Sequence, residues 1–84
     1  MQKPSVGYVV LARVNPLLNN GADYAPALIT RVWGPDVINV TVLPDAAYQV
    51  MPMTSVKLFA TESEARAGEG TGVIAHAAWW LPKA

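Results

Sequence analysis

The chain has 84 residues, of which 52% are hydrophobic and only 14% are charged, and its six basic and six acidic residues cancel. This length makes one domain, residues 1–84, and the composition is too apolar for a disordered chain. The zero net charge argues against binding to duplex nucleic acid by phosphate neutralisation. The absence of cysteine excludes disulfides and thiolate metal sites.

The residues before the first expected strand lack an apolar stretch of signal-peptide length. No run reaches the roughly 18–20 apolar residues that a membrane span needs. We therefore expect a cytoplasmic protein with no membrane partner.

The first expected strand is Val6–Val14, which is apolar on both faces. The loop Asn15–Tyr24 follows and contains an Asn-Gly turn signal. Leu17 and Leu18 lie inside this loop, so we expect it to fold back onto the body of the protein.

Two further strands, Ala25–Trp33 and Val37–Leu43, flank the turn residues Gly34–Asp36. Both are rich in β-branched and aromatic residues, which favours a hairpin. In the second of them, alternate residues from Ile38 to Val42 are apolar and predict one buried face. In the strand Ala25–Trp33, by contrast, the apolar residues do not share one face, so its register stays open.

A bulge near Thr30 and Arg31 would let both Ile29 and Val32 point inward.

The second half of the chain predicts two more strands and a short helical turn. Ala46–Met53 reads as a connection because Pro52 interrupts regular pairing, and Thr54–Ala60 reads as the fourth strand.

Thr61 and Glu64 have the spacing of a capping box, which starts a helical turn over Glu62–Ala67. A glycine-rich connection, Gly68–Gly72, leads to the fifth strand, Gly72–Trp80. This order of elements predicts an all-β fold, a small five-stranded SH3-like barrel with one short helical turn before the last strand. An OB-like barrel is the alternative, although its helix usually sits between the third and fourth strands.

Four stretches carry a resemblance that spans most of the chain after Tyr24: Tyr24–Trp33, Val37–Asp45, Thr54–Val56 and Trp79–Pro82. In these stretches the chain resembles small phage-encoded SH3-like β-barrel proteins of unassigned function. The resemblance implies a location in the cytoplasm of a host cell, or in a virion.

Catalytic signals are nearly absent, so we expect no enzyme, no cofactor and no metal. His76 is the only histidine, and no acidic residue near it has the spacing of a metal site. It is interpreted as a structural histidine. Gly68–Gly72 precedes a strand rather than a helix, so it lacks the geometry of a phosphate loop.

Three cations interrupt otherwise apolar strands, and a tryptophan follows one of them on the same face. If the strands align, Arg13, Arg31 and Lys57 form a cationic patch beside Trp33, which suits a phosphate and a stacked base. The alternative is that they are solvated residues of edge strands, where they discourage sheet-to-sheet pairing.

Trp79, Trp80 and Leu81 near the C-terminus are the expected interface residues. Adjacent tryptophans on a strand face opposite ways, so one of them should remain exposed or be covered by a partner. The alternative is a tryptophan that the Leu17–Leu18 loop covers at the mouth of the barrel.

A likeness to chromatin readers of the Tudor type extends to the fold only. Their aromatic cage binds methylated cations by cation–π contact, and Tyr24, Trp33, Tyr48 and Asp45 are its candidates here.

These observations predict a non-catalytic interaction module that is phage-encoded, forms a homo-oligomer and acts on a host or phage protein. One alternative is sequestration of a small nucleotide-like ligand at the cationic and aromatic patch. The other is a minor structural component of the virion, such as a decoration or connector protein.

Overall fold

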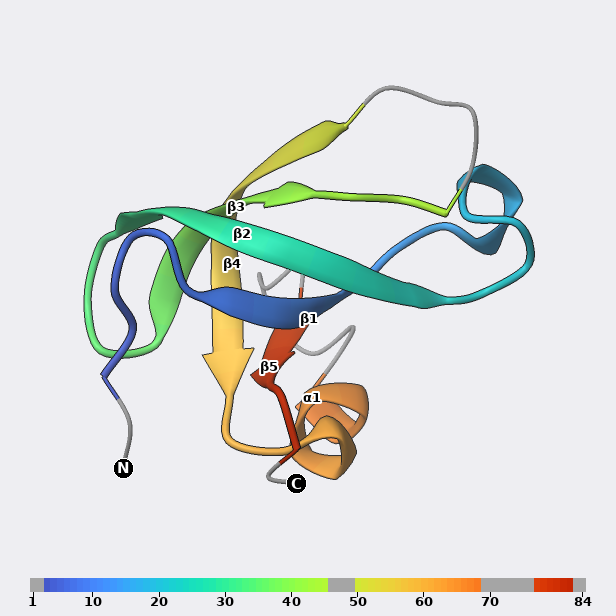
Figure 1. Cartoon of the computed structure of the whole chain (residues 1–84). Coiled ribbons are helices and arrows are strands. Elements are labelled where there is room, and N and C mark those ends of the chain that lie inside the picture. Colours follow the sequence, from blue (N-terminus) through green and yellow to red (C-terminus); the bar gives the residue numbers. More distant parts are fainter. Residues whose placement is uncertain (1–2, 46–49, 69–76, 83–84) are drawn as a thin grey trace.

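The computed structural model describes residues 3–45, 50–68 and 77–82, and its five strands close into a barrel (Figure 1). The elements in chain order are β1 (Val9–Arg13), the 3₁₀ helix η1 (Pro16–Leu18), β2 (Tyr24–Val32), β3 (Val37–Val42), β4 (Met51–Phe59), α1 (Glu62–Gly68) and β5 (Ala77–Trp80). Consecutive strands from β1 to β4 pair antiparallel, β5 pairs parallel with β4, and the antiparallel pairing of β5 with β1 closes the barrel. The predicted small all-β barrel with one short helix before its last strand is confirmed.

Alternation along the strands builds the core inside the barrel. Ile38, Val40 and Val42 of β3 are all buried, as their spacing predicts. The pairing of β2 with β3 shifts register between Ile29 and Arg31, which confirms the bulge predicted there. The core also contains Val10, Ala12, Ala25, Ala27, Ile29, Val56, Leu58 and Ala78.

The first strand is shorter than predicted. Gly7 adopts a φ of +96°, a left-handed conformation that glycine accepts without strain, and it places a turn where the strand was expected to begin. β1 therefore starts at Val9. Val6 and Tyr8 lie outside the strand and are exposed.

The fourth strand begins earlier than predicted, at Met51 instead of Thr54. Pro52 does not interrupt the strand and lies opposite Thr41 of β3. Within the described residues, β4 pairs with β5 only from Lys57 onward, so its first half pairs on one side alone. A proline is tolerated in such a position because its missing N–H can face away from the partner strand.

The first loop is held by a polar residue and not by its leucines. The expectation for Leu17 and Leu18 is wrong, since both are exposed and the Leu17 side chain is 84% accessible. Asn19 is instead 1% accessible. Its amide nitrogen donates to the carbonyl oxygens of Ala22 and Tyr24, and its amide oxygen accepts from the backbone N–H of Asp45 at 2.6 Å.

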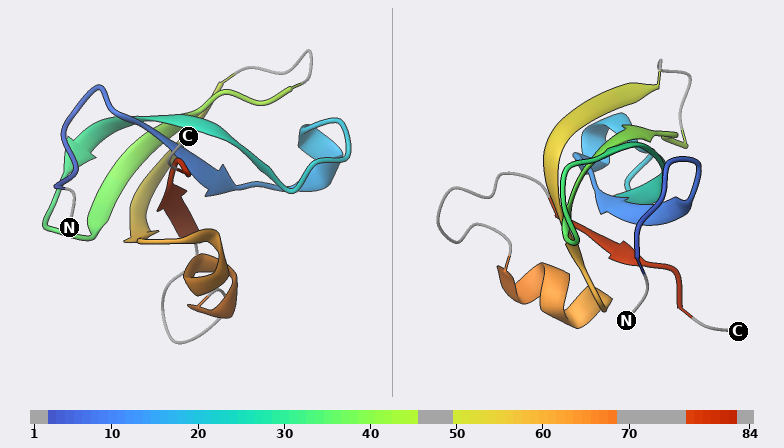
Figure 2. Two further views of the ribbon diagram at one scale, coloured as in Figure 1. Left: turned by 60° about the horizontal axis from the view of Figure 1, so that its bottom comes forward. Right: turned by 90° about the vertical axis from the view of Figure 1, so that its left-hand side faces the viewer.

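Helix α1 lies outside the barrel against β4 and β5 (Figure 2). The Thr61 hydroxyl accepts from the backbone N–H of Glu64 at 3.2 Å, the first of the two bonds of the predicted capping box. The helix packs onto a second apolar cluster formed by Ala65, Ala77 and Trp79, with Leu11 and Phe59 at its margin.

The structure describes only part of the predicted glycine-rich connection and fifth strand. The fifth strand is described from Ala77 onward, and residues 69–76, including His76 and most of the glycine-rich connection, lie outside the described residues. Tyr48 does so as well.

Replacing Asn19 with alanine would leave three backbone groups without their bonding partner, namely the carbonyl oxygens of Ala22 and Tyr24 and the N–H of Asp45. Because unmet buried polar groups cost about 1–3 kcal/mol each, we expect Asn19→Ala to lower the free energy of unfolding by roughly 2–3 kcal/mol. Urea denaturation followed by circular dichroism measures this. Leu17→Ala, in the same loop, is the control and should change stability little; equal stability of Asn19→Ala and the wild type would contradict the assignment.

Candidate interaction surface

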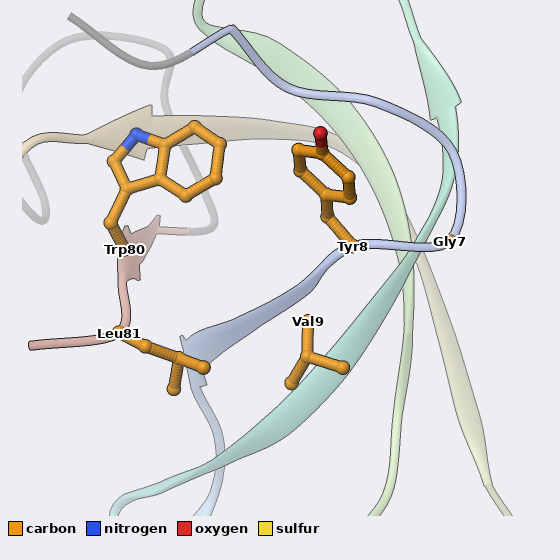
Figure 3. Close-up of a pocket in the computed structure, with 5 residues that line it drawn as sticks. All are labelled: Gly7, Tyr8, Val9, Trp80 and Leu81. Carbon is orange, nitrogen blue, oxygen red and sulfur yellow. The ribbon is translucent and has the colours of Figure 1, made fainter. Parts of the chain in front are cut away.

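A row of exposed apolar side chains runs from the residue after β5 across β1 to β2 on the outer face of the barrel. Val9 of β1 and Leu28 of β2 are directly paired, so their side chains stand on the same face. Leu81 follows Trp80, which pairs with Val10, and its side chain projects on the same side as that of Val9 (Figure 3). The accessible fractions are 48% for Leu81, 41% for Val9 and 39% for Leu28. We call these three residues the apolar row.

A depression of about 380 Å³ adjoins the apolar row at the start of β1. Val9 and Leu81 line it together with Gly7, Tyr8 and Trp80. The Tyr8 and Trp80 rings project to the side opposite the Val9 and Leu81 side chains and meet edge to face, with centroids 6.4 Å apart (Figure 3). The apolar row therefore borders a hollow that has two aromatic walls.

A stacked cation and aromatic ring lie at the far end of β2. The Arg31 guanidinium stands 4.0 Å from the centroid of the Trp33 ring. The Trp33 indole N–H donates to the Asn39 side-chain oxygen at 2.8 Å, and the same oxygen accepts from the backbone N–H of Ser55 at 3.0 Å. Ser55 has a φ of +56° and lies where β4 shifts register against β3, so Asn39 supports a strained bulge of β4 and fixes the ring at the same time.

The structure brings Arg31 and Trp33 together but does not gather the whole predicted cationic patch. Arg13 pairs with Tyr24 at the beginning of β2, whereas Arg31 lies near the end of that strand. Arg13 forms an ion pair with Asp23 at 2.6 Å, and Lys57 forms one with Asp36.

Asp23 joins the first loop to helix α1 through two arginines. Its carboxylate contacts Arg13 and also Arg66, at 3.1 Å, and Arg66 bonds Glu62 within the helix. Hydrogen bonds from Arg66 and then Arg13 lower the pKa of Asp23 from 3.8 to about 2. Asp23 is therefore a charged structural link at the end of the barrel remote from Arg31.

The two tryptophans face opposite ways, and the fold covers both of them in part. Trp80 packs against the main core, while Trp79 is 2% accessible in the second cluster. Tyr24 packs 5.8 Å from the Trp79 ring, and the Arg66 guanidinium stands 5.7 Å over it. The expectation that one tryptophan stays exposed or needs a partner is wrong, because α1 covers Trp79.

The structure does not bring together the described candidates for an aromatic cage. Tyr24 begins β2 and packs on Trp79, whereas Trp33 follows the other end of β2 and packs on Arg31. Asp45 is tied to the first loop through Asn19.

Sequence reasoning missed Val9, Leu28 and Asn39. The sequence leaves the outer face of both strands open, and the adjacency of Val9 and Leu28 depends on the register between them. The role of Asn39 depends on bonds to a tryptophan and a serine on different elements, which no local pattern indicates.

Among the described residues, no three potential ligating groups gather as they would around a metal ion. No helix within the described ranges has the length and apolar character needed to cross a membrane. Comparisons with family models, with curated proteins and with solved structures found no match for this chain.

We expect Asn39→Ala to destabilise the barrel and to loosen the Trp33 ring. The variant removes the common acceptor of two N–H groups, which corresponds to about 1–2 kcal/mol for a partly exposed site. Urea denaturation and the acrylamide quenching of tryptophan fluorescence measure the two effects. Asn39→Asp retains an acceptor oxygen and should behave closer to the wild type; equal losses in both variants would contradict the role of that oxygen.

The Asp23 ion pairs should stabilise the protein above the ordinary carboxyl pKa of 3.8 and lose their effect as the pH falls toward 2. The sign follows because the folded protein holds the proton of Asp23 less tightly than the unfolded chain does. The free energy of unfolding, measured against pH, should therefore fall more steeply in this interval for the wild type than for Asp23→Asn. Equal slopes in the wild type and in Asp23→Asn would contradict the role of these ion pairs.

Proposed function

We propose that the protein is a non-catalytic interaction module that docks on another protein through the apolar row. The observation that carries this proposal is the contiguity of Leu81, Val9 and Leu28, which remain exposed from the end of β5 across β1 to β2. Contiguous apolar surface on a small domain is typical of sites that a protein partner covers. Scattered exposed residues such as Leu17 need no such explanation.

The depression beside the row supports the same proposal. Interface hot spots are enriched in tryptophan and tyrosine, and they lie in pockets at the centre of a contact. Tyr8 and Trp80 form such a pocket next to Val9 and Leu81. Trp80 and Leu81 therefore remain proposed interface residues, while Trp79 serves the fold.

We also propose that a second copy of the chain is one of the partners, and that the protein is phage-encoded. The first part is supported by the high apolar fraction of so small a chain, and the second by the resemblance described above. A partner protein of the host or the phage, or a place in the virion, is compatible with the same surface.

A nucleotide-like ligand is the second candidate, and the stacking of Arg31 on Trp33 is the observation that favours it. Arg13 and Lys57, the other predicted phosphate contacts, are engaged with Asp23 and Asp36. The apolar row therefore carries the main proposal.

Sedimentation equilibrium of the wild type and of Leu28→Asp tests the contact surface. A charge buried in an apolar contact is unfavourable, so we expect the wild type to self-associate and Leu28→Asp to remain a monomer with unchanged circular dichroism. Leu17→Asp is the matched control, since it places the same charge on an exposed leucine of the first loop. A monomeric wild type would contradict the homo-oligomer, and an unchanged assembly of Leu28→Asp would show that the row is not its interface.

A further inference from the structure

Arg31 differs from the other cations of the described strands and helix. Arg13 and Arg66 share Asp23, and Lys57 pairs with Asp36. For Arg31, the structure within residues 3–45, 50–68 and 77–82 provides a contact with the Trp33 ring and no carboxylate. Its positive charge is therefore still available to a partner.

The guanidinium of Arg31 is held in place by its surroundings. One face of the group lies over the Trp33 ring, and the ring is fixed by its hydrogen bond to Asn39. Stacking on an aromatic face leaves the N–H groups at the guanidinium edge free to donate. Such an edge matches the two oxygens of a carboxylate, and less freedom is lost on binding because the group is already oriented.

Arg31 stands on the same outer face as the apolar row. The bulge between Ile29 and Arg31 lets Ile29 point into the core while Arg31 is exposed, as Leu28 is. Because of the bulge, the three steps from Leu28 to Arg31 lie opposite only two steps of β3, from Thr41 to Asn39, which corresponds to about 7 Å. An extended segment lying along β2 would span this distance with two residues, whose side chains point to the same face.

We propose that the partner docks an extended segment that has an apolar side chain over Leu28 of the row and an acidic side chain, two residues away, on Arg31. This inference rests on the proposed function and specifies the chemistry of the partner. The charge of Arg31 complements a carboxylate, and the exposed residues Leu28 and Trp33, which precede and follow it in the chain, are apolar. A phosphate-bearing nucleotide would instead need further cations, and Arg13 lies at the opposite end of β2.

An array of immobilised octapeptides tests the proposal on the intact protein. Alternate positions carry Val, Leu, Ile or Tyr, and every sequence is printed in two versions that differ only by Glu or Gln, two residues from the last apolar position. We expect some Glu peptides to bind about fivefold more tightly than their Gln counterparts, as measured for the selected pairs by fluorescence polarisation. Added salt should reduce this preference.

Two variants separate the charge from the apolar contact. Arg31→Gln should abolish the preference for Glu and keep the weaker binding shared by both versions, while Leu28→Asp should abolish the binding of both. Arg66→Gln removes the same charge at the other end of the barrel and should retain the preference. Circular dichroism checks that each variant is folded.

If the Glu and Gln versions bind equally well and Leu28→Asp binds neither, the proposed contact of an acidic side chain with Arg31 is overturned. The proposed function would still stand. Loss of the preference in Arg66→Gln as well would overturn the role of Arg31, since net charge would then explain it. An array without any binding peptide would overturn the inference. Adenosine monophosphate provides the last comparison. If it displaces bound peptides from the wild type but, at the same concentration, not from Arg31→Gln, the inference is overturned in favour of a nucleotide ligand.

Discussion

The short strand β5 is the constraint on which the rest of the structure depends. Its pairing with β1 on one side and β4 on the other closes the barrel. Because alternate side chains of a strand point to opposite faces, Trp80 packs against the main core while Trp79 packs outside it. One strand of four residues therefore holds both apolar clusters, and Trp79 provides the surface on which α1 rests.

The same division explains why the apolar row is exposed. Helix α1 covers the outer face of the barrel around Trp79 and Leu11, but Val9, Leu28 and Leu81 remain exposed. Within the described residues, the one short helix therefore buries only the part of the outer face around Trp79. The remainder of the outer face is available for contacts with other molecules, which is the basis of the proposed function.

The all-β fold could be predicted from the sequence because its strands have a clear period of two. Ile38, Val40 and Val42 show this period without interruption, and the bulge in β2 followed from its conflict between Ile29 and Val32. Pro52 was misjudged because the tolerance for a proline depends on which side of the strand is paired.

The candidate site was harder to predict because it is made by contacts between elements. The stacking of Arg31 on Trp33 followed from their spacing on one strand, whereas the pairing of Val9 with Leu28 required the register. Asn19 also could not be distinguished from Asn20 by composition, since only the approach of Asp45 from a distant segment makes it a buried anchor.

The closure of the barrel by β1 and β5 also leads us to expect an order of folding. β1 to β4 pair in the order of the sequence, and each of their pairings closes a short loop. The pairing of Val10 with Trp80 joins distant parts of the chain and carries the largest loss of chain entropy. During synthesis on the ribosome, the four-stranded meander can therefore form while its inner apolar face is still open on the side that β5 later closes. Folding in the cell then depends on how quickly the last strand follows, and a pause in translation just before β5 would prolong the aggregation-prone state.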